Sequence, residues 1–235
     1  MMTLRSLFRV QLAAGLLLGS ASLASAVTAV SNLGELSAGS VAINISIPPP
    51  GPCCSPAIGN SYAGSFVTGS AATLMNVTLA MNTGTGNNAF TVQLLGDSGG
   101  LPGTVLLTFT GNNNPITAGL YTYTAPAPYS LVGGTQYWVA ASNPSAPSSS
   151  YAWKSTSSSV SSGDPGWSIG RFASHQYTIA PNSSSPWSQS STSSVMFSVG
   201  IVPEPGTLTL SLLAVATLAR QSRRRRPSNM CGETS

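Results

Sequence analysis

Apolar side chains recur at every second position in several short runs of this chain. Because successive side chains of a β-strand point to opposite faces, each run places its apolar residues on one face of an extended strand. Clusters of Gly, Asn and Pro separate the runs, and these residues favour turns. The runs are Val41, Ile43, Ile45 and Ile47; Met75, Val77, Leu79 and Met81; Phe90, Val92 and Leu94; Val105, Leu107 and Phe109; Tyr121 and Tyr123; Tyr137, Val139 and Ala141; and Val195, Phe197 and Val199.

Many short strands separated by turn signals predict an all-β chain with a single β-sandwich or jelly-roll-like domain. We expect this domain to span residues 27–201, a length that can bury one sandwich core. The sequence Asn-Thr-Gly-Thr-Gly at residues 82–86 predicts a turn directly after the second run. Residues 145–194 are rich in serine but also contain aromatic residues, which predicts strands with long loops rather than a disordered linker.

The N-terminal residues 1–26 have the pattern of a secretory signal peptide. Arg5 and Arg9 provide a basic start, an apolar stretch follows at residues 12–18, and Ala24-Ser-Ala26 forms a small-residue cleavage site. The apolar stretch is too short for a membrane anchor, so we expect cleavage after Ala26. The residue directly after Ala26 is Val27 and not a cysteine, which argues against a lipoprotein.

Residues 202–226 form a second segment with an unusual order of parts. Pro203, Glu204 and Pro205 interrupt regular structure, residues 207–219 are uncharged and mostly aliphatic, and an arginine cluster closes the segment. The arginines are Arg220, Arg223, Arg224, Arg225 and Arg226. Arginines stay on the cytoplasmic side of a membrane, and the apolar part is shorter than the ~20 residues of a comfortable span. The segment therefore predicts a short C-terminal apolar helix that is held transiently in the inner membrane, followed by a tail at residues 227–235.

This C-terminal segment resembles the PEP-CTERM sorting signal, with Pro203, Glu204 and Pro205 at the positions of the motif. The resemblance implies recognition by an exosortase-like processing enzyme and export to the cell surface or extracellular matrix of a Gram-negative bacterium. The tail at residues 227–235 departs from the pattern, because such signals usually end at the arginines. An ordinary single-pass anchor that is never processed is the alternative interpretation.

A second resemblance lies inside the predicted domain. The stretch Phe90–Leu95, with Asp97 and Gly100-Leu-Pro-Gly103 after it, is similar to the choice-of-anchor R domain. The stretches Leu131–Trp138 and Tyr151–Trp153 add to this similarity, which spans roughly residues 60–200. It implies a secreted β-sandwich with a variable C-terminal anchor and implies no particular chemistry.

Charge is scarce and concentrated at the two ends of the chain. Charged residues make up 6% of the 235 residues, and the formal net charge is +4. Between residues 27 and 202 the charged side chains are Glu35, Asp97, Lys154, Asp164 and Arg171. The central part is thus nearly neutral and has no basic stripe, which excludes a nucleic-acid partner of the usual kind.

The segment Gly96-Asp-Ser-Gly-Gly100 matches the active-site motif of trypsin-like proteases. No histidine precedes Ser98, however, and His175 is the single histidine of the chain. The motif also stands between two predicted strands, where a hairpin turn explains it equally well. We therefore expect no protease and, with one histidine and scattered acids, no metal site and no cofactor.

Two smaller features leave alternatives open. Cys53 and Cys54 are either free loop thiols or a strained local disulfide, because their Cα atoms are only ~3.8 Å apart. Asp97 and Asp164 would have to converge to serve a glycoside hydrolase.

Aromatic residues in the late part of the domain are candidates for stacking on sugar rings. They are Tyr151, Trp153, Trp167 and Trp187. Packing in the core is the alternative role for each. We expect a non-enzymatic structural or adhesive surface protein; the alternative is a module that binds exopolysaccharide, and a secreted hydrolase is a more distant one.

Overall fold

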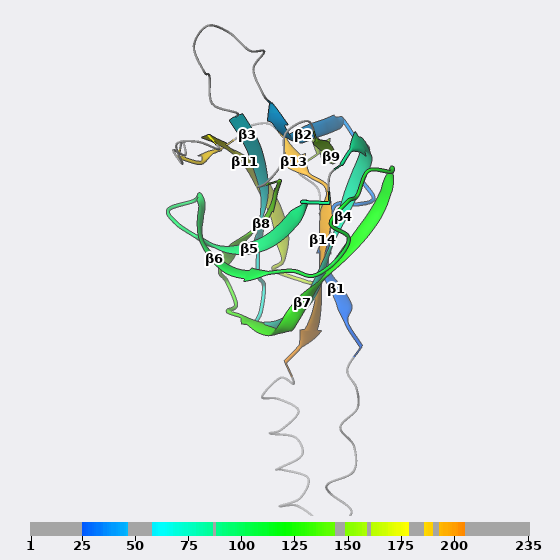
Figure 1. Cartoon of the computed structure of the whole chain (residues 1–235). Coiled ribbons are helices and arrows are strands. Elements are labelled where there is room, and N and C mark those ends of the chain that lie inside the picture. The colour runs from blue at the N-terminus through cyan, green and yellow to red at the C-terminus, as the bar shows by residue number, and fades with distance from the viewer. Residues whose placement is uncertain are drawn as a thin grey trace, which may run out of the picture.

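The computed structural model describes residues 25–46, 58–86, 88–143, 149–158, 161–178, 186–189 and 193–204. These residues form β-strands and turns without a helix, which confirms the all-β prediction for this part of the chain. All strand pairs are antiparallel, and they form two sheets that pack as a sandwich (Figure 1). Most of the signal peptide, Cys53, Cys54 and the C-terminal apolar segment lie outside the described residues.

The first sheet is built around the long strand β4. It contains β1 (Val27–Ser31), β4 (Ala72–Thr85), β7 (Gly119–Leu131), β9 (Ser150–Thr156), β10 (Ser162–Gly163), β13 (Ser194–Val195) and β14 (Phe197–Pro203), with most of β2 (Gly39–Ser46). One side of β4 pairs with β7, and the other side is shared by β14 and β9. Strand β1 then pairs with β14, and β10 pairs with β1.

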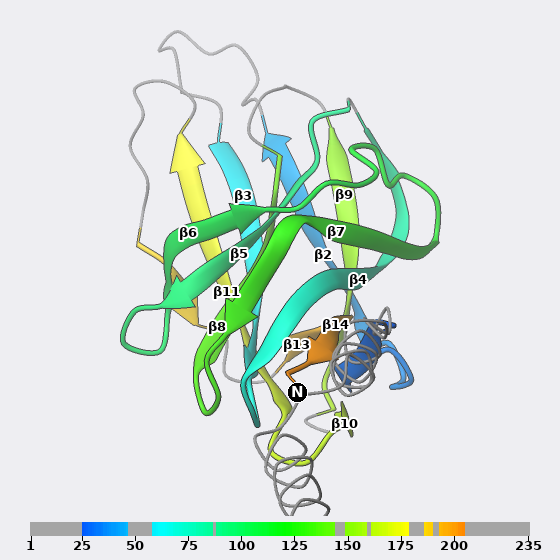
Figure 2. The same cartoon turned by 90° about the horizontal axis from the view of Figure 1, so that it is seen from below.

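The second sheet has the order β12-β11-β3-β8-β5-β6. Its strands are β3 (Ile58–Val67), β5 (Thr91–Asp97), β6 (Pro102–Thr108), β8 (Gln136–Ser142), β11 (Ser168–Thr178) and β12 (Ser188–Gln189). Figure 2 shows β6, β5 and β11 on one side of the molecule and β4 and β14 on the other. The second sheet thus has an outer face that points away from the first sheet.

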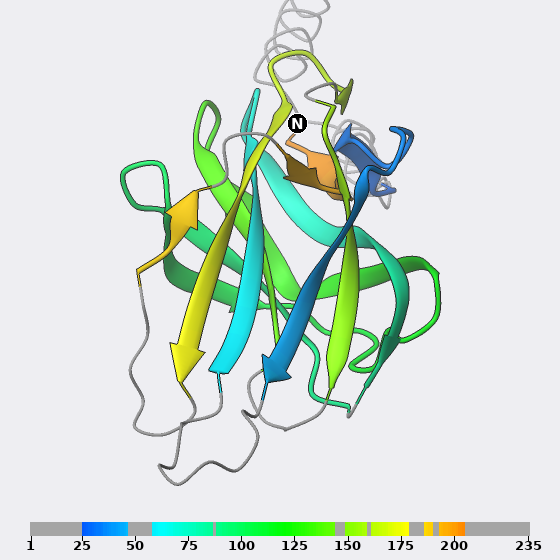
Figure 3. The same ribbon diagram turned by 90° about the horizontal axis from the view of Figure 1, so that it is seen from above.

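Strand β2 connects the two sheets along one side. Its residues 39–44 pair with β9, and Ile45 and Ser46 pair with the start of β3. In Figure 3 the blue β2 accordingly lies between the cyan β3 and the green β9.

Apolar residues of the inner faces form one continuous core between the sheets. Trp153 and Phe197 meet edge to face with ring centroids 6.2 Å apart, and Phe66 contacts Phe197 from the second sheet at 6.4 Å. Each of these rings is fully buried. Burial of a side chain of this size contributes about 1.5–3 kcal/mol, so the predicted alternation supplies much of the stabilisation of the sandwich.

The structure corrects two details of the predicted β4. A register shift between Leu74 and Asn76 exchanges the faces of the strand, so that Leu74 is buried and Met75 only partly so. The predicted turn at 82–86 is wrong, because β4 continues to Thr85, where it pairs with Ser150 of β9.

Two other strands differ from the simple alternation. Val105 was expected on a buried face but is 52% exposed, because β6 and β5 pair through two irregularities in register. In β8 the predicted inner residues are buried as expected, yet Trp138 and Ala140 on the opposite face are buried as well. The outer face of the second sheet therefore has apolar residues of its own.

The two ends of the described sandwich leave it side by side. Val27 of β1 is the register partner of Ile201 of β14. Figure 1 shows the free ends of these two strands at the same end of the molecule.

Candidate functional site

A row of small side chains crosses the middle of the second sheet on its outer face. Ala173 of β11 pairs with Ala63 of β3, and Ala63 pairs with Ala140 of β8. On one side of this row Leu95 pairs with Trp138, and on the other side His175 pairs with Ser61. Because short side chains lie between longer ones, the sheet surface is hollowed along this row.

A short segment, residues 186–189, carries Trp187 over this surface, and we call it the ledge. Strand β12 pairs with β11, and the hydroxyls of Ser188 and Ser174 are 3.2 Å apart. Gln189 Nε2 donates to the carbonyl oxygen of Gly100, in the turn between β5 and β6, at 3.4 Å. The ledge is thus held at both margins of the hollow, and Trp187 packs against the alanine row.

The hollowed surface consists of two adjoining cavities that share Gly103, His175 and Trp187. We call them together the outer-face groove. One cavity, of about 510 Å³, is lined further by Asp97, Ser98, Pro102, Thr104 and Pro186. The other, of about 350 Å³, is lined further by Ser61, Gln93, Leu95, Val105, Ala140 and Ser142.

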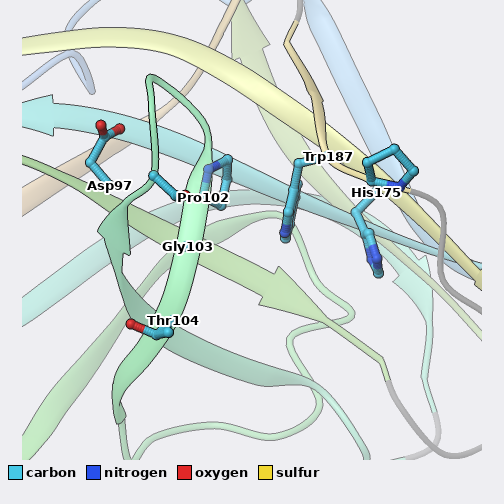
Figure 4. Close-up of a pocket in the computed structure, with 8 residues that line it drawn as sticks. Asp97, Pro102, Gly103, Thr104, His175 and Trp187 are labelled. Atoms are coloured by element: carbon cyan, nitrogen blue, oxygen red, sulfur yellow. The ribbon is translucent and has the colours of Figure 1, made fainter.

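Trp187 stands between the two cavities with its indole partly exposed. The ring of His175 stacks on it, with centroids 4.9 Å apart and an interplanar angle of 29°. Figure 4 shows Pro102 on the side of Trp187 that faces away from His175. One face of the indole is therefore covered by the imidazole, and the other is turned toward Pro102, which lines the groove.

Two serines on the outer face of β3 differ in their hydrogen bonding. Ser65 is 4% exposed, and its hydroxyl donates to the carbonyl oxygen of Arg171 at 3.0 Å. Ser61 is 5% exposed and lines the groove, but its hydroxyl has no hydrogen-bond partner among the described residues. Ser61 Oγ is not among the buried unpaired atoms of the described residues, so this hydroxyl is accessible from the groove and Ser61 is a candidate for binding a ligand.

Asp97 fixes one end of the groove. Its Oδ1 accepts hydrogen bonds from Gln136 Nε2 at 2.6 Å and Trp138 Nε1 at 2.9 Å, and its Oδ2 accepts from the Gly100 amide at 3.0 Å. Burial alone would raise the pKa of this carboxyl, but the three hydrogen bonds together hold its pKa below the ordinary value. The carboxylate therefore stays ionised at neutral pH and orients the Trp138 indole.

His175 has a pKa below its ordinary value because burial disfavours the charged imidazolium. At neutral pH the ring facing Trp187 is thus uncharged. An uncharged imidazole can donate one hydrogen bond and accept another.

The protease-like motif does not assemble a catalytic triad among the described residues. The Ser98 hydroxyl makes no hydrogen bond there, whereas a nucleophile needs a base within about 2.6–3.2 Å. The carboxylate of Asp97 is occupied by Trp138, Gln136 and Gly100. In Figure 4, Pro102 and Trp187 lie between Asp97 and His175. The motif instead forms the turn between β5 and β6, with the Ser98 amide bonded to the Leu101 carbonyl at 2.8 Å.

The structure separates the four aromatic residues predicted to stack on sugars. Tyr151 and Trp153 are fully buried, and Trp167 is 7% exposed within the same core. Their packing between the sheets removes these three from any sugar-binding surface. Trp187 alone among the four lies in the outer-face groove.

Sequence reasoning did not find the groove itself. Ser61, Ala63 and Ala140 were not singled out, although β8 carries apolar residues at successive positions from Tyr137 to Ala141. Such a run is typical of a strand covered on both faces. It was the available signal for a second apolar surface.

The predicted processing sites lie at the margins of the described chain. Ala26 precedes β1 and is exposed, and Pro203 and Glu204 are exposed at the end of β14. Ala24, Pro205 and the arginine cluster fall outside the described residues.

The described residues include no group of three or more His, Cys, Asp or Glu that could hold a metal ion. No helix in this part of the chain is long and apolar enough to cross a membrane. In comparisons with known proteins, no family model, no curated protein and no solved structure matches this chain.

Proposed function

We propose that this chain is an exported, non-enzymatic structural or adhesive protein of a Gram-negative cell envelope or extracellular matrix. In this proposal residues 1–26 are removed on export, and residues 202–226 form a PEP-CTERM-like signal that an exosortase-like enzyme processes at the inner membrane. A choice-of-anchor R-like sandwich is then displayed at the surface.

The pairing of β1 with β14 is the observation that supports this proposal best. Because Val27 and Ile201 are register partners, the two ends of the sandwich emerge together. Ala26 is exposed directly before β1, Pro203 is the exposed last residue of β14, and Glu204 is exposed directly after it. Both proposed cuts therefore fall outside the hydrogen-bonded core, and a tether at this end leaves the rest of the sandwich accessible.

Intact-mass analysis of the protein from the envelope of an exosortase-containing Gram-negative host tests the proposal. We expect a mature chain that begins at Val27 and ends near residue 205. The variant Pro203→Ala/Glu204→Ala should retain the C-terminal arginines and remain in the inner membrane. Wild-type surface protein that still carries Arg223–Arg226 would contradict processing and support an ordinary anchor.

A further inference from the structure

The outer-face groove combines the indole of Trp187 with polar side chains in the wall beside it. The indole of Trp187 lines both cavities, with the face away from His175 turned toward Pro102, and Ser61 lies in the wall of the groove. Sugar rings have an apolar C–H face and a rim of hydroxyls, so a ring stacked on an indole brings its hydroxyls to groups beside it. Ser61, Ser142 and Gln93 are the polar side chains of that cavity beside Trp187 and His175.

The charges around the groove select among sugars. Asp97 is the one carboxylate among the residues that line the two cavities, and no lysine or arginine lines them. Because hydrogen bonds keep Asp97 ionised, a negative charge stays at one end of the groove. It repels uronate-rich or sulfated chains, and its oxygens already accept bonds from the protein. A neutral polysaccharide is not repelled by Asp97 and does not need the oxygens of Asp97 as hydrogen-bond acceptors.

We infer that the outer-face groove is a binding site for a neutral polysaccharide, with one sugar ring stacked on Trp187 and a hydroxyl of the chain bonded to Ser61. The choice of a matrix polysaccharide as the natural ligand rests on the proposed function. Binding itself does not, because it is measured on purified protein and is independent of processing near residue 205.

Calorimetry and tryptophan fluorescence of the full-length purified chain test this inference. The probes are neutral hexasaccharides (cello-, laminari-, manno- and xylohexaose), with hexagalacturonate as the charged comparison. The other tryptophans, Trp138, Trp153 and Trp167, are 7% exposed or less, so a fluorescence change on binding reports Trp187. We expect at least one neutral hexasaccharide to bind at least tenfold more tightly than hexagalacturonate and to shift the emission. Trp187→Ala should weaken binding tenfold or more.

Ser61 and Ser65 provide a matched pair of variants on the same face of β3. Ser61→Ala should weaken hexasaccharide binding about three- to tenfold and leave the resistance to urea unchanged, because it removes a hydroxyl that faces the groove and makes no hydrogen bond to another described residue. Ser65→Ala should leave binding unchanged and reduce the resistance to urea, because its hydrogen bond to Arg171 is lost.

Three results would overturn the inference. The first is that no neutral hexasaccharide binds, and the second is that Ser61→Ala and Ser65→Ala bind alike. The third is a dimer in sedimentation that Val105→Glu dissociates and Val132→Glu does not, with no effect of hexasaccharide. Both valines are exposed, at 52% and 62%, and only Val105 lines the groove, so this result would identify an interface between copies of the chain.

Discussion

Trp153 offers the sharpest test of the core. Its indole is fully buried, and its Nε1 donates to the carbonyl oxygen of Met196 at 2.8 Å. The Ala80 amide also donates to this oxygen, at 3.1 Å, so replacing Trp153 with Phe does not leave the carbonyl without a partner. The lost hydrogen bond then costs about 1 kcal/mol. The missing ring atoms and the space they leave beside Phe197 cost about 1–2 kcal/mol more.

We therefore expect Trp153→Phe to lower the free energy of unfolding by about 2–3 kcal/mol. The assay is urea unfolding followed by far-UV circular dichroism, because the substitution removes a fluorophore. The midpoint should fall with an unchanged slope. Trp187→Phe is the control and should cost less than about 1 kcal/mol, since Trp187 is partly exposed. Equal losses for the two variants, or a larger loss for Trp187→Phe, would refute the assignment of Trp153 to the core and Trp187 to the surface.

Three further predictions concern core packing and the pH dependence of the free energy of unfolding. Gly64→Ala would place a Cβ 2.6 Å from Phe197 Cε1 and should cost about 1–3 kcal/mol in urea unfolding, whereas Gly96→Ala, with its nearest atom at 3.8 Å, should cost less. Burial raises the pKa of Asp97, but its hydrogen bonds lower this pKa overall, so the carboxylate contributes its full stabilisation above about pH 4 and loses it as the pH falls further. Asp97→Asn should therefore make the free energy of unfolding depend less on pH in this acid range. An unchanged pH dependence in the variant would contradict the prediction. Burial lowers the pKa of His175, so the free energy of unfolding should decline slightly as the pH falls below about 6.5, and His175→Gln should abolish that step in a urea titration at each pH.

The fold class could be predicted because apolar residues alternate with a period of two along several strands. Val77, Leu79 and Phe197 stood out in the sequence and are fully buried in the structure. The faces of Leu74 and Met75 could not be predicted, because a single irregularity in register exchanges them, and the sequence alone carries no mark of it.

The candidate site was accessible to sequence reasoning only in part. Trp187 was named, but together with Trp153 and Trp167, which the structure places in the core. Which tryptophan is exposed depends on the strand beside it and on what covers that strand. Ser61 carries no motif, and it is a candidate only because its strand neighbours place it in the wall of the groove.

The sequence by itself determined the all-β class, the near-neutral character of the central part and the candidate address signals at the two ends, because each depends on residues close together in the chain. Only the tertiary structure decided which faces are covered and which side chains meet. Ala63, Ala140 and Ala173 are far apart in sequence and become one row through the registers of β3, β8 and β11. The ledge at Trp187 then closes over that row through contacts with β11 and with the turn at Gly100. The groove arises from pairing between distant strands, and local sequence patterns do not encode such pairing.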